Sequence, residues 1–446
     1  MKYIKSYNQL KVWEAPLFLF ILSFFLFIAC PDPPKDNTPN RDTTIHLEVL
    51  STFTTTAKLY ISVEDTTAEW TFGLTRNGED ILTATVYNGD TTFTDNGLTP
   101  NTQYTYQAQW LNNGLAVDSS LNTIVQTMDT TSHNFIWEFD TLGDPGSYLK
   151  DVDIVNENNI WVVGKIRDGD STYNVAHWDG SIWEYIFIDL NVDFDGVFAF
   201  DERDIWFVNG CFVYYYDGLT FTKQFECDYE TYGPNLIQKA WGTSSSNMYF
   251  IGNSGSIVHY DGTTFTRMES GTDLPLLNIT GSGDKIFVTA MGYYGDFIGS
   301  ALLANENDNW HSVFSSDNYL PDGSEENYGF FFGIDVYGDT TYIYSKAGVI
   351  HYNYLTGHYL LDSAKVNLFY YDYHTLKVQS PNDIILFSYS GMTLHYNGMD
   401  WQRDRGTWIT GNGNLYFNGT YKDDVAIVVG QLAYYGALIA VGRHQL

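Results

Sequence analysis

Basic residues are scarce in this 446-residue chain, which has 22 lysines and arginines against 54 aspartates and glutamates. The formal net charge at pH 7 is −32. A surface of this sign repels a phosphate backbone, so we expect no nucleic-acid partner. The same charge keeps an exported chain soluble and attracts divalent cations in a general way, without locating a site for one.

Catalytic signatures are also missing. The chain has no Gly-x-Ser-x-Gly, Walker-type, His-Glu-x-x-His or Cys-x-x-Cys motif. It also lacks the Ser-x-Asp-x-Gly-x-x-Trp box of sialidases, and its arginines share no position that would form a carboxylate-binding cluster. We therefore assign no catalytic residue. The alternative is a glycan-active hydrolase, similar to a glycosidase, with an unrecognised pair of carboxylates.

The chain has one long apolar run, PLFLFILSFFLFIA at residues 16–29, which follows Lys2, Lys5 and Lys11. Crossing a bilayer takes about 20 residues, so the run predicts a removed export signal over residues 1–29. The segment FIAC resembles the lipobox of bacterial lipoproteins. The resemblance implies that Cys30 carries acyl chains, palmitate among them, and anchors the chain to the outer membrane or cell surface. The alternative is an ordinary signal peptide with an incidental cysteine.

Proline is concentrated after this signal, where PDPPKDNTPNRD predicts a semi-rigid tether over residues 30–42. Only two further cysteines exist, Cys211 and Cys227. An even number in an exported chain, placed on either side of a DGLT turn, suggests a disulfide. Two free thiols remain the alternative, because adjacent strands often have unsuitable geometry.

Residues 43–129 show short alternating segments, such as KLYISV and YTYQAQW, separated by the turn signals RNGED, YNGD and LNNG. This pattern predicts a β-sandwich. Within it LTPNTQYTYQA resembles the tyrosine corner of fibronectin type III domains. The matching residues are Leu98, Pro100, Thr102, Tyr104 and Tyr106. The resemblance implies a spacer or binding domain in which a tyrosine hydroxyl closes onto backbone a few residues upstream.

Residues 133–446 repeat an aromatic residue, an Asp-Gly-like turn and a second aromatic residue. The first aromatic residue recurs with gaps of 38, 44, 92 and 44 residues, at Trp178, Tyr216, Tyr260, Tyr352 and Tyr396. The gap of 92 spans two periods and predicts a degenerate copy with Leu303 in this position. Val441 and Gly442 would belong to a seventh copy. Repeats of this length with four strands indicate a β-propeller blade.

Two details of the repeat favour a structural role over chemistry. Asp-Gly accepts positive φ at low cost, so it suits the turn between the third and fourth strands. Histidines precede four of the turns, at His177, His259, His351 and His395. Equivalent positions in different blades are spread around a ring, so these side chains are not expected to converge on one metal ion.

Closure of the ring follows from a match between two segments. HNFIWEFDT at residues 133–141 resembles GSIWEYIFI of the first repeat, while the seventh repeat lacks a fourth strand. We expect this N-terminal strand to complete the last blade and to leave no open edge. The predicted fold is all-β, a fibronectin type III-like sandwich followed by a seven-bladed β-propeller.

Calcium is the cofactor that we considered. In NVDFDGVFAFDE, Asn191, Asp193, Asp195, Gly196 and Glu202 approach EF-hand spacing. The segment also aligns with LKDVDIVNENNIWVV of the first repeat, which explains it by blade periodicity. We therefore favour no cofactor and no metal.

The ligand-binding candidates are aromatic residues beside glycines in irregular segments, which offer large contact area at little rotamer cost. They are Tyr293, Tyr294, Tyr328 and Phe330. The alternative is that they fill space between blades. The whole arrangement resembles Bacteroidetes-type surface lipoproteins that carry a fibronectin type III domain before a propeller. The resemblance implies a non-catalytic adhesion module that binds an extracellular glycan or protein.

Overall fold

The computed structural model describes residues 45–63, 69–87, 89–188, 193–227, 237–294, 297–315, 331–345, 347–355, 357, 359–362, 373–389, 392–404, 415–432 and 434–445. Every element in these ranges is a β-strand, as the alternating sequence pattern predicts. In the same ranges, no helix has the length and apolar character needed to cross a membrane. The predicted signal, the tether and Cys30 lie outside the described residues.

The N-terminal strands form two antiparallel sheets. One has the order β1-β2-β5, and the other has the order β4-β3-β6-β7 with β8 also paired to β6. The strands are β1 (Ile45–Thr52), β2 (Thr56–Val63), β3 (Trp70–Arg76), β4 (Glu79–Val86), β5 (Asp90–Asn96), β6 (Gln103–Asn112), β7 (Leu115–Ser119) and β8 (Thr123–Gln126). Every second residue of β2 is buried, so one face of this strand packs into the core with Trp70, Phe72 and Tyr106.

Two tyrosines of β6 fix the corner of this unit. The backbone amide of Thr99 donates to the Tyr104 hydroxyl at 2.8 Å, which is the predicted closure onto upstream backbone. The buried Tyr106 hydroxyl donates to Asp95 at 2.7 Å, and Asp95 pairs with Arg76 at 2.9 Å. Burial and the Asp95 carboxylate raise the pKa of Tyr106, which therefore stays a neutral donor.

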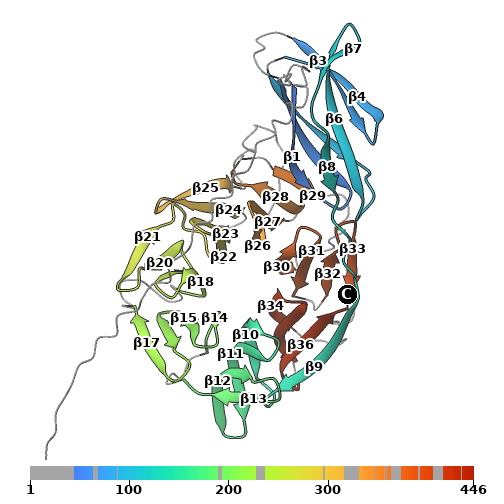
Figure 1. Ribbon diagram of the computed structural model, residues 1–446. Helices are drawn as coiled ribbons and strands as arrows, with labels where there is room; N and C mark the ends of the chain where they lie inside the picture. Colours follow the sequence, from blue (N-terminus) through green and yellow to red (C-terminus); the bar gives the residue numbers. More distant parts are fainter. Residues whose placement is uncertain are drawn as a thin grey trace, which may run out of the picture. The chain divides into compact units, whose positions relative to one another are not determined.

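The remaining described strands form seven four-stranded antiparallel sheets, which follow one another around a ring in Figure 1. The first sheet contains β10 (Tyr148–Asn156), β11 (Asn159–Asp168), β12 (Ser171–Trp178) and β13 (Trp183–Ile186). The second contains β14 (Gly196–Asp201), β15 (Asp204–Asn209), β16 (Phe212–Tyr216) and β17 (Phe221–Glu226). The third contains β18 (Lys239–Ser244), β19 (Asn247–Ile251), β20 (Ser256–Tyr260) and β21 (Phe265–Glu269).

The other four sheets continue in the same order. They are β22 (Leu276–Ser282), β23 (Lys285–Tyr294), β24 (Phe297–Glu306) and β25 (Asn309–Ser315); β26 (Phe331–Tyr337), β27 (Thr340–Ser345), β28 (Gly348–Asn353) and β29 (Tyr359–Asp362); β30 (Tyr373–Ser380), β31 (Asp383–Ser388), β32 (Thr393–Tyr396) and β33 (Trp401–Asp404); and β34 (Leu415–Lys422), β35 (Val425–Leu432) and β36 (Gly436–His444) with β9 (Phe135–Leu142).

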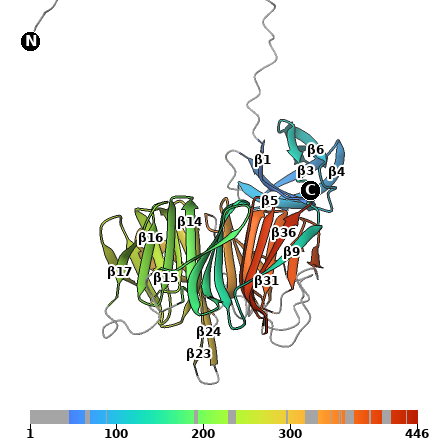
Figure 2. The same ribbon diagram turned by 90° about the horizontal axis from the view of Figure 1, so that it is seen from below.

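The first strand of each sheet lies innermost, because β10, β14, β18, β22, β26, β30 and β34 each contact the next one and β34 contacts β10. Figure 2 shows the strands of neighbouring sheets side by side, with the long hairpin β23–β24 extending beyond the others. Apolar clusters fill the spaces between sheets. One of them joins Val152, Ile160 and Val162 to Ile427 and Ile439 across the seam between the first and last sheets.

The last sheet is completed by β9, which pairs with β36 in antiparallel register as the sequence predicts. Trp137 lies opposite Gly442 and Glu138 opposite Val441. Gly442 needs its missing side chain, because a Cβ there would lie 2.8 Å from the Trp137 ring. The Trp137 indole also donates to Asp404 of β33 at 2.7 Å, which ties the closing strand to the preceding sheet.

The repeated turns adopt the predicted geometry. Trp178, Tyr216, Tyr260 and Tyr396 each lie opposite an aromatic residue five positions later, across the turn. In the third of these turns Gly262 has φ of 90°, and the Asp261 carboxylate accepts the amides of Thr263 and Thr264 at 2.8 Å each. Hydrogen bonds from Thr263 and Thr264 hold the pKa of this exposed carboxyl well below its usual range.

One position in the repeat was predicted wrongly. In the fourth sheet the residue opposite Trp310 is Asn305 rather than Leu303. The turn consists of Asn307 and Asp308, both at positive φ. Asn305 and Trp310 are five positions apart, as in the Asp-Gly turns, whereas Leu303 lies seven positions before Trp310. A shift of two leaves the residue on the same face of the strand, which is why the phase of the repeat still held.

Candidate functional site

A cavity of about 190 Å³ lies among the innermost strands of the ring. We call it the axial cavity. Its polar lining residues come from six of the seven inner strands and are Asp151, Asp153, Lys239, Asn278, Thr280, Asp335, Thr375, Lys377, Asn418 and Thr420. Phe198 and Trp241 add aromatic surface. Alternation along each inner strand puts residues two apart, such as Asp151 and Asp153, on the cavity side.

Asp151 joins four sheets. Its carboxylate accepts the amide of Val197 on β14 at 3.2 Å, pairs with Lys239 of β18 at 2.9 Å and accepts from the Asn418 side chain of β34. The amide of Val152 on its own strand adds a bond at 3.0 Å. Because its side chain is 6% exposed, this carboxylate depends on these donors, and it is committed to holding the inner strands together.

Asp153 and Asp335 repeat this arrangement. Asp153 accepts the amides of Ile154 at 2.9 Å and of Ala199 on the next inner strand at 2.8 Å. Burial raises the pKa of Asp153 to about 6, although both amides and the charge of Lys377 oppose the rise. Asp335 accepts the amide of Val378 at 2.9 Å, again from the next inner strand. The carboxylates therefore act first as links between sheets.

Of the two lysines that line the axial cavity, Lys377 is the one whose ammonium group is not paired with a carboxylate in the described chain. Within the described parts of the chain it makes no hydrogen bond and no ion pair, while Lys239 is engaged by Asp151. Beside the cavity Trp241 packs over Gly281, where a Cβ would lie 2.6 Å from its ring. The axial cavity thus offers an ammonium donor and an aromatic surface to a polar group entering from solvent. Among the described lining residues the Thr280 hydroxyl donates to Asp335 at 3.3 Å, which is a further link between inner strands.

None of the aromatic candidates from the sequence stands among the described residues that line the axial cavity. Tyr293 and Tyr294 end strand β23, opposite Ile298 and Phe297 of β24, and their side chains lie outside the description. Tyr328 and Phe330 fall outside the described residues. The axial residues were missed, although a signal existed: polar residues recur at alternate positions of the first strand of each repeat, as in KDVDIV and NITGS.

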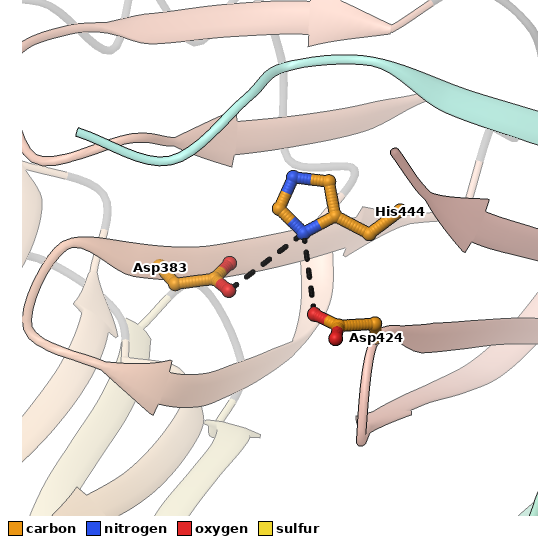
Figure 3. A group of neighbouring side chains, drawn as sticks. All are labelled: Asp383, Asp424 and His444. Carbon is orange, nitrogen blue, oxygen red and sulfur yellow. Dashed lines mark ion pairs between the residues drawn. The ribbon is translucent and has the colours of Figure 1, made fainter. Parts of the chain in front are cut away.

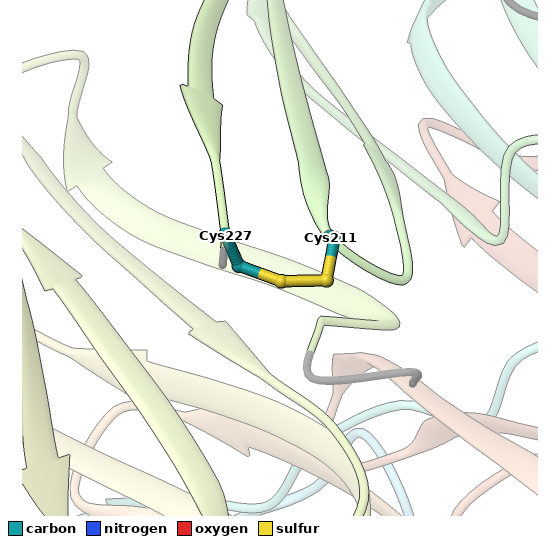
Figure 4. Close-up of a disulfide and its surroundings, with 2 residues drawn as sticks. All are labelled: Cys211 and Cys227. Atoms are coloured by element: carbon teal, nitrogen blue, oxygen red, sulfur yellow. A yellow bond between two sulfur atoms is a disulfide. The ribbon is translucent and has the colours of Figure 1, made fainter. Parts of the chain in front are cut away.

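Cys211 and Cys227 form a disulfide, shown in Figure 4. Their Cα atoms are 4.9 Å apart, and the amide of Cys227 donates to the carbonyl of Cys211 at 2.9 Å. The link joins the start of β16 to the residue after β17, so it lies across the hairpin that contains the DGLT turn. Both cysteines belong to a buried cluster with Trp206, Phe250 and Ile237.

The residues of the calcium candidate are dispersed. Asp193 accepts from the Tyr148 hydroxyl, and Asp195 pairs with Lys150 at 2.6 Å. Glu202 lies in the turn after β14, next to Arg203 at 3.6 Å. Asn191 lies outside the described residues. The strand β14 begins at Gly196, where an EF-hand would continue its loop. The carboxylates of Asp193 and Asp195 are instead paired with Tyr148 and Lys150 of β10.

Three of the histidines that precede the turns are bonded within their own sheets. His177 Nε2 lies 3.0 Å from Asn159 Oδ1, and His259 Nε2 lies 2.7 Å from Asn247 Oδ1. His395 Nε2 lies 2.9 Å from Asp383 Oδ1. The partner is in each case the first residue of the second strand. This recurring pair fixes the third strand against the second and explains the histidines without a shared metal.

No protein-family model and no curated protein matches the chain. Solved structures do match. YCF48 bound to D1 peptide is 14% identical, with 71% of this chain and 100% of that chain covered and a TM-score of 0.51. YCF48 from Cyanidioschyzon merolae is 14% identical, over 69% and 98%, with a TM-score of 0.47. The WD40 β-propeller domain of Doa1 is 11% identical, over 70% and 98%, with a TM-score of 0.49. At these identities the likeness concerns the fold alone, and that fold is a β-propeller.

Proposed function

We propose that this chain is a non-catalytic binding protein of the cell surface. In this proposal each four-stranded sheet is one blade of a seven-bladed propeller, and residues 43–129 form a fibronectin type III-like domain. Cys30 carries the lipid anchor, and the tether and the N-terminal domain hold the propeller away from the outer membrane. The lipobox-like segment and the tyrosine corner support these assignments.

The observation that carries the binding function is the axial cavity. Its carboxylates are used by inter-sheet hydrogen bonds, so they are poorly placed for acid–base work on a substrate. Lys377 and Trp241 remain available to a ligand. The ligand is an extracellular protein or glycan that presents a polar group to this cavity. YCF48 has been solved with the D1 peptide, and a propeller that holds a peptide agrees with a protein ligand here.

Binding to arrays of glycans and of purified secreted proteins tests the proposal, with the full chain as the probe. Replacing Lys377 by alanine should weaken binding to a positive spot at least tenfold, because the ligand loses a charged partner of about 1.5–3 kcal/mol. Lys223→Ala is the control, since Lys223 lies on the outer strand β17 beside Glu226. Turnover of chromogenic glycosides without stable capture would contradict the proposal in favour of a hydrolase.

A further inference from the structure

Three side chains meet where the last two sheets join, as shown in Figure 3. Asp383 begins β31, Asp424 lies in the turn between β34 and β35, and His444 ends β36. We call them the closure cluster. Their ligand atoms all lie within 4.8 Å of one another. The side chains of Asp383 and His444 are 6% and 0% exposed, while Asp424 is 43% exposed and gives the cluster access to solvent.

The orientation of His444 is fixed from outside the cluster. Its Nε2 is hydrogen-bonded to the carbonyl oxygen of Ser132, which can only accept, so Nε2 carries a proton. The ring of Phe135 stacks on the imidazole at 4.6 Å and an angle of 5°. His444 Nδ1 therefore faces the cluster, 3.5 Å from Asp424 Oδ1 and 3.9 Å from Asp383 Oδ2.

The cluster has more acceptors than donors. The Tyr421 hydroxyl lies 3.0 Å from both Asp383 Oδ2 and His444 Nδ1, but it has one proton to give. His395 satisfies the other oxygen of Asp383 at 2.9 Å. Among the described residues, the group that faces the carboxylate of Asp424 is His444 Nδ1, which carries no proton in this tautomer. If Tyr421 donates to Asp383 Oδ2, the lone pair of His444 Nδ1 is left facing the Asp424 carboxylate. If it donates to His444 Nδ1 instead, Asp383 Oδ2 loses this proton. In either case one lone pair that faces the cluster lacks the Tyr421 proton, and a cation could occupy the space between these atoms.

We propose that the closure cluster binds one zinc ion through His444 Nδ1, Asp383 Oδ2 and Asp424 Oδ1. Imidazole nitrogen with carboxylate oxygen is a donor set for a first-row transition metal rather than for calcium or magnesium. Bonds of about 2.0–2.2 Å place tetrahedral ligand atoms about 3.4 Å apart, and His444 Nδ1 lies 3.5 and 3.9 Å from the two carboxylate oxygens, so small movements of the side chains would complete the site. The Ser132 carbonyl is the outer partner that a metal-bound histidine normally has.

The cation would join the end of β36 to the neighbouring sheet. Asp383 belongs to one sheet, whereas Asp424 and His444 belong to the next, so binding requires both sheets to be in place. A ligand that binds only the folded chain stabilises it by mass action. Zinc should therefore raise the unfolding temperature, and the rise should depend on the zinc concentration.

Isothermal titration of the chelator-treated full chain with zinc chloride tests the site. One equivalent should bind the unmodified protein, and Asp424→Asn and His444→Gln should each weaken this event at least tenfold. Asparagine tolerates the φ of 64° at position 424, so Asp424→Asn should fold. His259→Gln is the matched control, because His259 is a half-buried histidine paired with an asparagine away from the cluster.

Thermal unfolding measured with and without zinc distinguishes a result that supports the site from one that contradicts it. A zinc-dependent rise in the unmodified chain and in His259→Gln, lost in Asp424→Asn, supports the site. Equal zinc affinity in all variants would place the ion elsewhere and overturn the proposal. Absence of one-equivalent binding would overturn it too. Tighter binding of calcium than of zinc would contradict the assigned metal.

Discussion

Single histidines give this fold a dependence on pH. Burial lowers the pKa of His259 from its ordinary value of 6.5, and the same cause lowers that of His177. The unfolded chain then binds protons below about pH 6.5 that the folded chain does not. The stability contributed by these neutral histidines is complete above that pH and declines as the pH falls toward the folded-state pKa.

We expect the free energy of unfolding to fall between pH 7 and pH 5.5, and to fall less steeply in His259→Gln. Urea unfolding at several pH values measures both slopes. Asp153 acts in the opposite direction, because its pKa of about 6 lets the folded chain hold a proton that the unfolded chain releases. Comparing the variant with the unmodified chain cancels this contribution. Identical slopes would contradict the lowered pKa, because they would show that folding does not change proton binding at His259.

Alternating polar residues mark several inner strands in the sequence, but the contacts that these residues make at the axis, and the closure cluster, were not predictable from it. The histidine that precedes a turn could be assigned a structural role because its repeat position was visible. The contacts of Asp153 and Lys377 depend on which inner strands face each other, and the sequence does not show this. Asp383, Asp424 and His444 are equally hidden, because they occupy three different positions of the repeat in two sheets.

At the scale of strands and turns the sequence was informative. The turns with their flanking aromatic residues located most of the outer hairpins, because a turn that needs positive φ restricts the residues that can form it. Where the aromatic residue was lost, as at Asn305, the position was missed by two residues. The aromatic binding candidates were chosen as residues beside glycines in irregular segments, and this placement was wrong for Tyr293 and Tyr294, which belong to strand β23.

The disulfide between Cys211 and Cys227 should stabilise its hairpin. The cysteines are 16 residues apart, and closing a loop of this size restricts the unfolded chain by about 3 kcal/mol. The double variant Cys211→Ser and Cys227→Ser should therefore unfold at lower denaturant concentration, with a loss of about 2–4 kcal/mol. Denaturant unfolding of both proteins without reductant measures this difference.

Reduction provides the control for this prediction. Adding dithiothreitol should lower the stability of the unmodified chain toward that of the double variant and leave the variant unchanged. Two reactive thiols in the denatured, unreduced chain would contradict the disulfide.

For the whole molecule, closure by β9 decides whether the ring has an open edge. Without β9 the strand β36 would expose unpaired amides and carbonyls along its length, and such an edge pairs with other chains. A chain that begins at residue 129 keeps β9, whereas one that begins at residue 143 lacks it. The first should be a monomer and the second should oligomerise, which light scattering after size exclusion measures. A monomeric, cooperatively folded second chain would show that closure is dispensable.

The same pairing bears on how the protein is made. Glu138 of β9 forms an ion pair with Arg443 of β36 at 2.7 Å, although the two are 305 residues apart in sequence. Strand β9 is synthesised early and stays unpaired until its partner β36 has been synthesised. Pairing at such separation is slow to form, so a cell that makes this chain has to shield an aggregation-prone strand until synthesis is nearly finished.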